Sequence, residues 1–222
     1  MITVIMATHN AERTLPGAIE SILSQTFENF EFLIMNDGST DSTQKILNNY
    51  ALVDKRIKLF ENKKNIGLTE SLRHLAGESS YEILARQDSD DRSHKKRFEK
   101  QYNILSTTNF SICTTRSQSM QTLKKVPGLS YFLPKKIILK YKNPFIHGTL
   151  MIKKQAYLDV GGYDIDYKYA QDYKLILDLY DAGKKIKTLN EILYYLNTTD
   201  NISTLNADEQ KYYFNLARKN RN

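Results

Sequence analysis

The chain has 222 residues, of which 41% are hydrophobic and 26% are charged. This composition is typical of a folded globular protein and excludes disordered and collagen-like chains, and no apolar run approaches the roughly 18 residues of a membrane-spanning helix. The single cysteine, Cys113, excludes an internal disulfide framework, and the first residues lack the basic region of a signal peptide. We therefore expect a cytoplasmic protein whose one cysteine is a small core residue.

The net charge of +7 is unevenly distributed along the chain. From Arg92 to Lys154 there are 14 lysines and arginines against one acidic residue, Glu99, which gives this segment a charge of +13. The rest of the chain holds 18 basic and 24 acidic residues and is negative. A lysine-rich composition alone does not explain this segregation, which indicates an anionic partner for the basic segment.

The first half of the chain alternates predicted strands and helices. Runs of β-branched and apolar residues predict strands over 2–7, 30–35, 57–60 and 82–85, and helical periodicity predicts helices over 15–23, 43–50, 68–76 and 94–105. Pro16 suits a first helical turn, Asp41 and Ser42 can cap the second helix, and Gly77 suits the end of the third. The alternation favours a parallel sheet covered by helices on both faces.

The second half has a less regular pattern. Residues 106–143 contain prolines and lysine pairs between short apolar stretches, and are followed by a predicted strand over 149–152 and a helix over 170–182. The tail over 206–222 is polar and is predicted to be helical. Because no repeat or linker separates two units, we expect one domain over 1–222 with parts at about 1–105, 106–205 and 206–222.

Polar residues follow three of the predicted strands. They are Thr8-His9-Asn10, Asn36-Asp37-Gly38-Ser39 and Gln87-Asp88-Ser89-Asp90-Asp91. Ligands of open parallel sheets bind at the carboxyl ends of the strands, so these residues are expected to form one site. The first turn has no glycine and no phosphate-binding loop occurs elsewhere, which excludes a dinucleotide fold and argues that a bound diphosphate is neutralised in another way.

The acidic cluster could neutralise a diphosphate through a metal. Asp88 and Asp90 lie two residues apart and would project the same way from extended backbone. Paired carboxylates suit Mg²⁺ or Mn²⁺, which commonly take one or two protein carboxylates together with phosphate oxygens. A solvated turn that caps the following helix would have the same spacing, so the residues alone leave both interpretations open.

A series of motifs runs in order from residue 2 to about residue 200. They are Val4–Asn10, Ser21–Thr26, Asn36–Asp41, Asn65–Leu68, Ala85–Asp91, Arg97 with Gln101, Asn143–Thr149, Gly161–Asp164 and Gln171–Tyr173. Together they resemble the motifs of family 2 nucleotide-sugar glycosyltransferases, which build bacterial surface polysaccharides. The resemblance implies the α/β GT-A fold, with a mostly parallel twisted sheet flanked by helices. One Rossmann-like nucleotide-sugar-binding half (about 1–105) would be fused to an acceptor-binding half (about 106–205).

The resemblance also implies a UDP-sugar donor and a divalent metal, Mn²⁺ or Mg²⁺. Asp37 would hydrogen-bond the uracil, Asp88 would face the ribose and diphosphate, and Asp90 would hold the metal with Asp88. The donor-binding residues would be Thr8, Asn10, Glu12, Asp37, Asn65, Gly67, Arg86, Asp88, Ser89 and Asp90. Structural alternatives remain, because the residues after the first strand could cap the first helix, Asp37 could form a turn, and Asp91 could serve the helix that follows it.

On the acceptor side, family members of this type invert the anomeric carbon, and Asp172 matches their general base. The residues alone do not choose among Asp164, Asp166 and Asp172, and an aspartate early in a helix is also a favourable dipole partner. The resemblance assigns substrate binding to His147, Gly162, Tyr163 and Gln171, with a structural role as the alternative for His147.

This chain departs from its relatives in two places. Tyr195-Leu196-Asn197-Thr198 stands where relatives often have Tyr-Arg-x-His, and the helix after Asp172 lacks their Trp and Arg. These departures leave the acceptor specificity and any third metal ligand open. The lead hypothesis is transfer of a sugar to a saccharide or lipid-diphosphate-linked acceptor, and the alternative is a non-catalytic member that binds nucleotide-sugar or serves as a scaffold.

The basic segment bears on the choice of partner. It lacks the regular basic-aromatic motif of proteins that bind single-stranded nucleic acid, so we expect no nucleic-acid partner. Lysines alternate with apolar residues over 133–142, which suggests a peripheral contact with an anionic membrane at its inner face. Ordinary solvated lysines on a core-packing helix would give the same pattern. The oligomeric state is not predicted.

Overall fold

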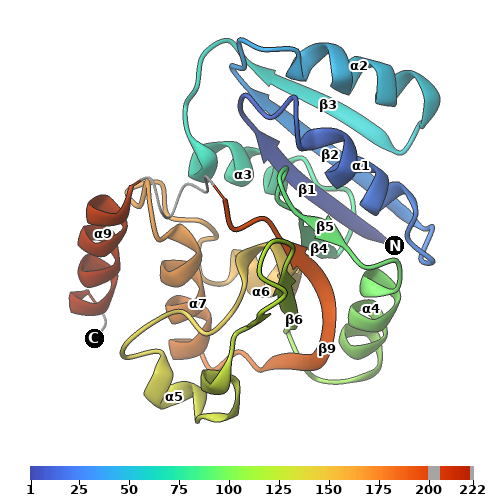
Figure 1. Cartoon of the computed structure of the whole chain (residues 1–222). Coiled ribbons are helices and arrows are strands. Elements are labelled where there is room, and N and C mark those ends of the chain that lie inside the picture. The colour runs from blue at the N-terminus through green and yellow to red at the C-terminus, as the bar shows by residue number, and fades with distance from the viewer. Residues whose placement is uncertain (200–205, 221–222) are drawn as a thin grey trace.

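The computed structural model describes residues 1–199 and 206–220 of the chain (Figure 1). The strands in this part are β1 (Ile2–Thr8), β2 (Phe30–Asp37), β3 (Ile57–Asn62), β4 (Ile83–Arg86), β5 (Arg92–Ser93), β6 (Ile112–Ser119), β7 (Lys125–Val126), β8 (Met151–Lys153) and β9 (Ile186–Leu196). The α-helices are α1 (Leu15–Leu23), α2 (Thr43–Val53), α3 (Leu68–Gly77), α4 (Arg97–Thr107), α5 (Lys135–Ile138), α6 (Lys154–Leu158), α7 (Gln171–Asp181) and α9 (Ala207–Lys219). Two 3₁₀ helices, η1 (Leu129–Phe132) and η2 (His147–Thr149), complete the set.

The described strands form a single sheet in the order β3-β2-β1-β4-β8-β6-β9-β5, with β7 paired to β6. The β1–β4 part is parallel, as predicted, and β8 then enters antiparallel to both β4 and β6. In Figure 1 the sheet begins at β3, with the blue strands β2 and β1 next to it, and the orange β9 curls through the other part of the sheet. The same sheet therefore passes through both predicted halves of the chain, whose division remains a prediction.

Alternating side chains of β1 enter two separate cores. Val4 and Met6 pack in a cluster with helix α1, whereas Ile5 and Ala7 face a cluster that contains residues of α3 and α7. Every residue of β1 is buried. The strand is thus covered on both faces, as its unbroken apolar run predicts.

A buried carboxylate ties the amino ends of the parallel strands together. Glu31 of β2 accepts hydrogen bonds from the Thr3 hydroxyl (2.6 Å), the Ser80 amide (2.7 Å) and the Lys58 ammonium (2.7 Å). Burial raises the pKa of Glu31, but these donors together outweigh burial and hold its pKa below the ordinary value. The ionised form of Glu31 is therefore favoured by folding.

Strands β6 and β9 are the main elements that the sequence analysis did not predict, and β6 shows why. Its buried side chains include Thr114, Thr115, Ser117 and Ser119 in place of an alternation of apolar and polar residues. These hydroxyls are satisfied inside the sheet: Thr114 shares a hydrogen bond of 3.0 Å with Thr188, and Ser117 donates to a β7 carbonyl. Partnered hydroxyls allow a buried strand without an apolar run.

The other predicted elements are confirmed, with shifts at their ends. Helix α4 begins at Arg97, three residues later than the predicted start, because Arg92 and Ser93 pair with β9 as the short strand β5. The predicted strand over 149–152 begins only at Met151, after the η2 turn.

The polar tail forms helix α9, which lies beside α7 (Figure 1). The Phe214 ring stacks on Tyr173 of α7 with centroids 4.2 Å apart. The end of the predicted acceptor half at 200–205, and residues 221–222 of the tail, lie outside the described residues. Within the described part, no helix combines the length and apolar character needed to cross a membrane.

Cys113 is a core residue, as predicted. Its side chain in β6 is fully buried, and burial raises the pKa of the thiol to about 12. A thiol held in this way is unreactive at neutral pH.

Candidate functional site

The three polar segments predicted to converge do meet at the carboxyl edge of the sheet. The register pairs Thr8 of β1 with Asn36 of β2, and Asp37 of β2 with Asn62 of β3. Arg86 ends β4 on the other side of β1. The hydroxyl of Thr8 is buried and has no hydrogen-bond partner among the described residues, so it is available to a ligand at this edge.

The loop after β1 is held by the loop after β2. The Asn10 amide oxygen accepts from the Thr40 backbone N–H (2.8 Å), while Asn10 itself has the left-handed φ of 49°. The Glu12 carboxylate accepts from the backbone N–H of Ser42, the N-cap residue of α2, at 2.9 Å. Glu12 therefore caps α2, whereas the capping role considered from the sequence was at the first helix, α1.

Asp37 fastens the loop that carries two of the predicted donor residues. Its carboxylate is buried and accepts from the Asn62 side chain (2.8 Å) and from the backbone N–H groups of Ile66 (2.9 Å) and Gly67 (2.8 Å). Gly67 has a φ of 98°, a conformation that glycine adopts without strain. Asn65 is exposed between these contacts. The uracil contact predicted for Asp37 stays a prediction.

Two buried guanidinium groups lie beneath the acidic loop after β4. Arg86 forms an ion pair with Asp88, and its Nε and Nη1 atoms have no hydrogen-bond partner among the described residues. Arg97 donates to the carbonyl oxygens of Arg86 (3.0 Å) and Gly148 (2.5 Å). Burial lowers the pKa of Arg97 to about 10, so it remains a cation at neutral pH. These positive charges stabilise the loop's carboxylates.

The carboxylates of the acidic loop have different surroundings. Burial, with the charge of Asp88, raises the pKa of Asp90 to about 6. Asp91 is buried further and accepts from the backbone N–H of Asn197 at 2.6 Å, and burial raises its pKa well above the ordinary value. Asp91 thus joins this loop to the end of β9 and does not serve the helix after it. Ser89 lies half-buried between Asp88 and Asp90.

The carboxylate oxygens of this loop are ligands that suit a divalent cation. Two half-buried carboxylates, Asp88 and Asp90, lie close enough for the charge of one to perturb the other. The described residues contain no group of three or more His, Cys, Asp or Glu side chains arranged to hold a metal alone. A cation here would take its other ligands from a diphosphate or from water, which is how Mg²⁺ commonly binds.

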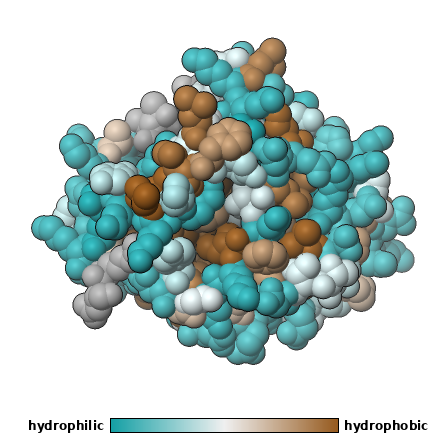
Figure 2. Space-filling view, turned by 90° about the horizontal axis from the view of Figure 1, so that it is seen from below, coloured by the Kyte–Doolittle hydropathy of each residue, from teal (hydrophilic) through white to brown (hydrophobic). Residues whose placement is uncertain are grey.

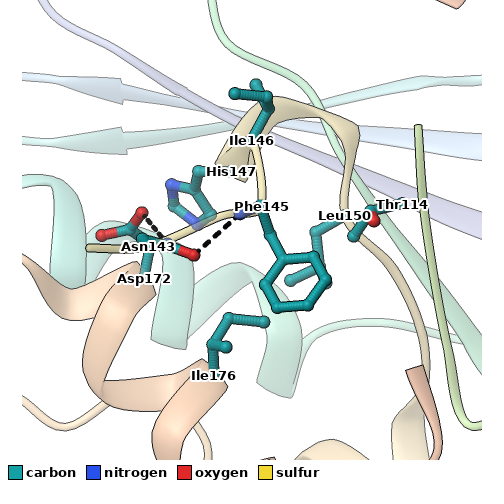
Figure 3. A pocket seen from close by; sticks show the side chains of 8 residues that line it. All are labelled: Thr114, Asn143, Phe145, Ile146, His147, Leu150, Asp172 and Ile176. Atoms are coloured by element: carbon teal, nitrogen blue, oxygen red, sulfur yellow. Dashed lines mark hydrogen bonds between the residues drawn. The ribbon is translucent and has the colours of Figure 1, made fainter. Parts of the chain in front are cut away.

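Asp172 and His147, two of the residues predicted for the acceptor side, line a small cavity together with Asn143 (Figure 3). Asn143 donates its amide N–H to Asp172 Oδ2 at 2.7 Å, and its oxygen accepts from the Phe145 backbone N–H at 3.0 Å. The His147 ring lies next to both side chains, and Ile176 of α7 lies below them. The cavity measures about 10 Å³, which is room for about one water molecule. The cavity is therefore too small to enclose a sugar.

His147 is held by a residue of the next predicted motif. Its Nε2 atom and the Tyr163 hydroxyl share a hydrogen bond of 2.7 Å. Burial and the charge of Arg86 lower the pKa of His147, which favours the neutral ring, whereas the charges of Asp172 and Asp88 act in the opposite direction. The ring therefore lies within the electrostatic reach of both carboxylates.

The other three residues predicted to bind substrate are Gly162, Tyr163 and Gln171, and they do not line the cavity. Gly162 has a φ of 73°, and a Cβ atom there would meet the Tyr157 ring at about 2.5 Å. Tyr163 is buried and receives the His147 contact, and Gln171 is buried as the first residue of α7. The structure thus places Tyr163 against His147 and Gly162 against Tyr157.

Sequence reasoning missed two residues that connect the parts of the site. The Tyr194 hydroxyl of β9 accepts the backbone N–H of Asp88 at 3.1 Å and donates to the Asp91 carboxylate. A Cβ atom at Gly148 would meet Asp88 Oδ2 at 2.6 Å, so only glycine fits here between the acidic loop and β9. Gly148 lies in the Asn143–Thr149 motif, whereas no motif or periodicity in the sequence indicates a role for Tyr194.

The chain is similar in sequence to known glycosyltransferases. The model of the family described as glycosyl transferase family 2 matches residues 3–161. The chain is 35% identical over 205 residues to the putative glycosyltransferase EpsE of Bacillus subtilis, covering 87% of this chain and 71% of that protein. It is 34% identical over 192 residues to the O-antigen biosynthesis glycosyltransferase WbnJ of Escherichia coli, covering 84% and 74%.

Two solved structures resemble the fold closely at low sequence identity. Staphylococcus aureus TarS 1–349 in complex with UDP-GlcNAc matches with a TM-score of 0.78 and 18% identity, covering 97% of this chain and 65% of that one. The mannosyltransferase PcManGT from Pyrobaculum calidifontis, in complex with GDP-Man and Mn²⁺, matches with a TM-score of 0.73 and 16% identity, covering 90% and 58%. The fold is the GT-A fold that the motifs imply, and the chain is a glycosyltransferase that belongs to glycosyl transferase family 2.

Proposed function

We propose that this enzyme transfers a sugar from a UDP-sugar, with inversion, to a saccharide or lipid-linked saccharide acceptor in bacterial surface-polysaccharide synthesis. The observation that carries the proposal is the position of η2 between two carboxylates. Gly148 abuts the Asp88 carboxylate, and the adjacent His147 lines a cavity with Asp172. A donor held at the acidic loop and an acceptor held at Asp172 would therefore meet at this turn.

The donor would lie along the carboxyl edge of the sheet. The unpartnered hydroxyl of Thr8 supports a ligand there, as do the loops of Asn10 and Glu12 and the Asn65–Gly67 stretch fastened by Asp37. The TarS complex holds UDP-GlcNAc, and a uracil-containing donor of this kind agrees with the uracil contact we assign to Asp37. The donor sugar is left unassigned in this proposal.

Asp90 and Asp88 would hold a divalent metal, Mn²⁺ or Mg²⁺, between them and the diphosphate. Such an ion supplies Lewis-acid stabilisation of charge on the departing nucleoside diphosphate. Arg86 forms an ion pair with Asp88 and so would hold its carboxylate in place for this role. Ser89 lies between the two ligands and would contact the donor phosphates.

Asp172 would act as the general base. One of its oxygens accepts from Asn143, and the other has no hydrogen-bond partner among the described residues, so it can receive the proton of an acceptor hydroxyl. As that O–H bond breaks, the acceptor oxygen forms a bond to the anomeric carbon. The bond from that carbon to the diphosphate breaks with its electron pair on the leaving group. The His147 ring, whose pKa is lowered by burial, would shape the sugar site together with Gly162, Tyr163 and Gln171.

The relatives point to the biological setting. WbnJ is named for O-antigen biosynthesis, and a further relative, AmsE of Erwinia amylovora, is named for amylovoran biosynthesis at 22% identity over 234 residues. We therefore place the enzyme in the synthesis of a surface polysaccharide, on the cytoplasmic side where nucleotide-sugars are made. That placement and the single-domain organisation are parts of the proposal.

Transfer from a panel of UDP-sugars, paired with a thermal-shift assay, tests the proposal. A donor at a hundredfold over its Kd should stabilise the protein by about 2.7 kcal/mol, and only when Mn²⁺ or Mg²⁺ is present. Asp172→Asn should keep this shift while lowering kcat by a factor of roughly 10² to 10⁴. Asp178→Asn on the same helix, where Asp178 pairs with Lys174, is the matched control.

The outcomes separate the parts of the proposal. Undiminished transfer by Asp172→Asn would remove the assigned base. Absence of a metal-dependent shift with every UDP compound would remove the donor assignment. Binding of a UDP-sugar without transfer to any acceptor would favour the non-catalytic alternative.

A further inference from the structure

The segment 129–142 exposes an unusual number of large apolar side chains. Leu129 is 87% exposed, Phe132 70% and Tyr141 71%, and Leu133 and Ile137 are more than half exposed. Lys136, Lys140 and Lys142 are exposed among them. We call these eight residues of η1, α5 and the turn after α5 the η1–α5 surface.

The segment is firmly attached to the protein on its inner side. Ile138 and Leu139 are buried, and the Tyr173 hydroxyl donates to the Leu139 carbonyl. Lys135 turns inward, donates to the Tyr131 carbonyl at 2.9 Å and lies over the Tyr131 ring. The alternative of a helix that packs on the core is therefore confirmed for Ile138 and Leu139. The outer residues are presented by an anchored helix.

The outer residues have a regular arrangement. Ile137 precedes Tyr141 by four residues, and helical backbone hydrogen bonds continue from α5 to Lys142, so these two side chains share one face, whereas Leu133 lies in extended backbone just before the helix. Lys136 and Lys140 repeat the same spacing one residue earlier, so they flank the apolar row. Figure 2 views the molecule from the end where Figure 1 places α5, and brown apolar surface there is interleaved with teal hydrophilic surface.

The lysines of this surface lack compensating charges. The sequence contains no aspartate or glutamate between Lys100 and Leu158. Among the described residues, none of Lys136, Lys140 and Lys142 forms an ion pair. A surface of this kind combines uncompensated positive charge with apolar groups that could be withdrawn from water.

We propose that the η1–α5 surface docks onto an anionic phospholipid membrane. The exposed apolar side chains would enter the boundary between headgroups and acyl chains, and the flanking lysines would contact the anionic headgroups. A second copy of the chain is a poorer occupant, because a symmetric contact through this patch would set its lysines against one another. Charge complementarity therefore selects the lipid surface.

Docking would also orient the candidate site. The η1–α5 surface ends at Lys142, immediately before Asn143, whose amide holds Asp172. A docked enzyme would thus present its acceptor side toward the membrane, where a lipid-linked acceptor is located. This consequence rests on the proposed function, whereas docking itself does not, so the two can fail separately.

Vesicle sedimentation of the full chain, without donor or acceptor, tests docking directly. The probes are vesicles of phosphatidylcholine alone and vesicles of equal parts phosphatidylcholine and phosphatidylglycerol. We expect binding to the anionic vesicles that weakens as salt rises, and little binding to the neutral ones. Equal binding to both compositions, or binding to neither, would overturn the proposal. So would a salt-sensitive dimer that forms without vesicle binding.

Paired variants locate the binding surface. Lys136→Gln/Lys140→Gln should partition onto anionic vesicles roughly thirtyfold more weakly. Lys45→Gln/Lys55→Gln removes the same charge from exposed positions in and just after α2, and should change binding severalfold less. Equal losses from the two pairs would show that net charge alone drives binding, and would overturn the assignment of the surface.

A third variant tests the apolar part. Phe132→Ser/Ile137→Ser should bind anionic vesicles at least tenfold more weakly at unchanged net charge. Because both side chains are largely exposed, its circular dichroism and thermal unfolding should match the parent protein. Unchanged vesicle binding by this folded variant would contradict insertion of the apolar row.

Discussion

Removing the Tyr194 hydroxyl should loosen the acidic loop from β9. Tyr194 is completely buried, and its hydroxyl accepts the backbone N–H of Asp88 at 3.1 Å and donates to Asp91. Tyr194→Phe keeps the ring that lies under the Arg97 guanidinium, but it leaves a backbone donor and a carboxylate without this partner. A buried group left unpaired costs about 1–3 kcal/mol, so we expect the free energy of unfolding to fall by this amount.

The same change should weaken metal-dependent donor binding. Asp88 lies at the start of the loop that we propose holds the metal, and loss of a contact that orients a metal ligand typically lowers metal affinity about 10- to 100-fold. Urea unfolding gives the stability, and titration of Mn²⁺ at fixed UDP gives the affinity. Tyr195→Phe, at the half-buried neighbouring position, should stay within about 0.5 kcal/mol of the parent protein. A Tyr194→Phe protein as stable as this control would refute the reasoning.

Three further changes test other parts of the structure. Folding lowers the pKa of Glu31, so ionised Glu31 adds to the free energy of unfolding above its ordinary pKa of 4.5. This added stability is lost as pH falls below that value and the carboxylate is protonated. Acid unfolding curves of Glu31→Gln and of the parent protein should therefore converge below pH 4.5. Asn143→Ala should lower kcat by about tenfold without changing donor KM, because Asn143 contacts Asp172 and the Phe145 backbone and none of the predicted donor-binding residues; a raised donor KM in steady-state kinetics would contradict this. Gly148→Ala should cost about 1–3 kcal/mol in urea unfolding, whereas Gly77→Ala, with open space at its Cβ, should not destabilise.

The donor edge was predictable because local pattern determines it. Unbroken apolar runs indicate parallel strands, and parallel strands bring their carboxyl ends to one edge. Thr8, Asp37 and Asp88 could therefore be placed together without knowledge of any contact. What the pattern could not give was the partner of each side chain, since Asp37 contacts Gly67, 30 residues away along the chain.

The remainder of the site depends on contacts between distant segments. Tyr194 reaches Asp88 across 106 residues, and Asn143 reaches Asp172 across 29. Neither pair has a local periodicity that would mark it. Strand β6 escaped prediction for a related reason, because its hydroxyls are satisfied by residues such as Thr188, 74 positions later. Burial of polar side chains becomes interpretable only once their partners are known.

Residues 195–198, which differ from the Tyr-Arg-x-His motif of relatives, form hydrogen bonds with other parts of this chain. Thr198 stands where relatives often have a histidine, and both its backbone N–H and its hydroxyl donate to the Gln121 side chain at 2.9 Å. The preceding Asn197 uses its backbone N–H to hold Asp91. These residues thus connect the end of β9 to the β6–β7 turn and to the acidic loop, and Thr198 offers no imidazole to a metal. With Asp91 engaged by β9, Asp88 and Asp90 are the carboxylates of this loop left for a cation. A metal at this site would consequently take its remaining ligands from the diphosphate and from water, and the shared diphosphate would couple its binding to that of the donor.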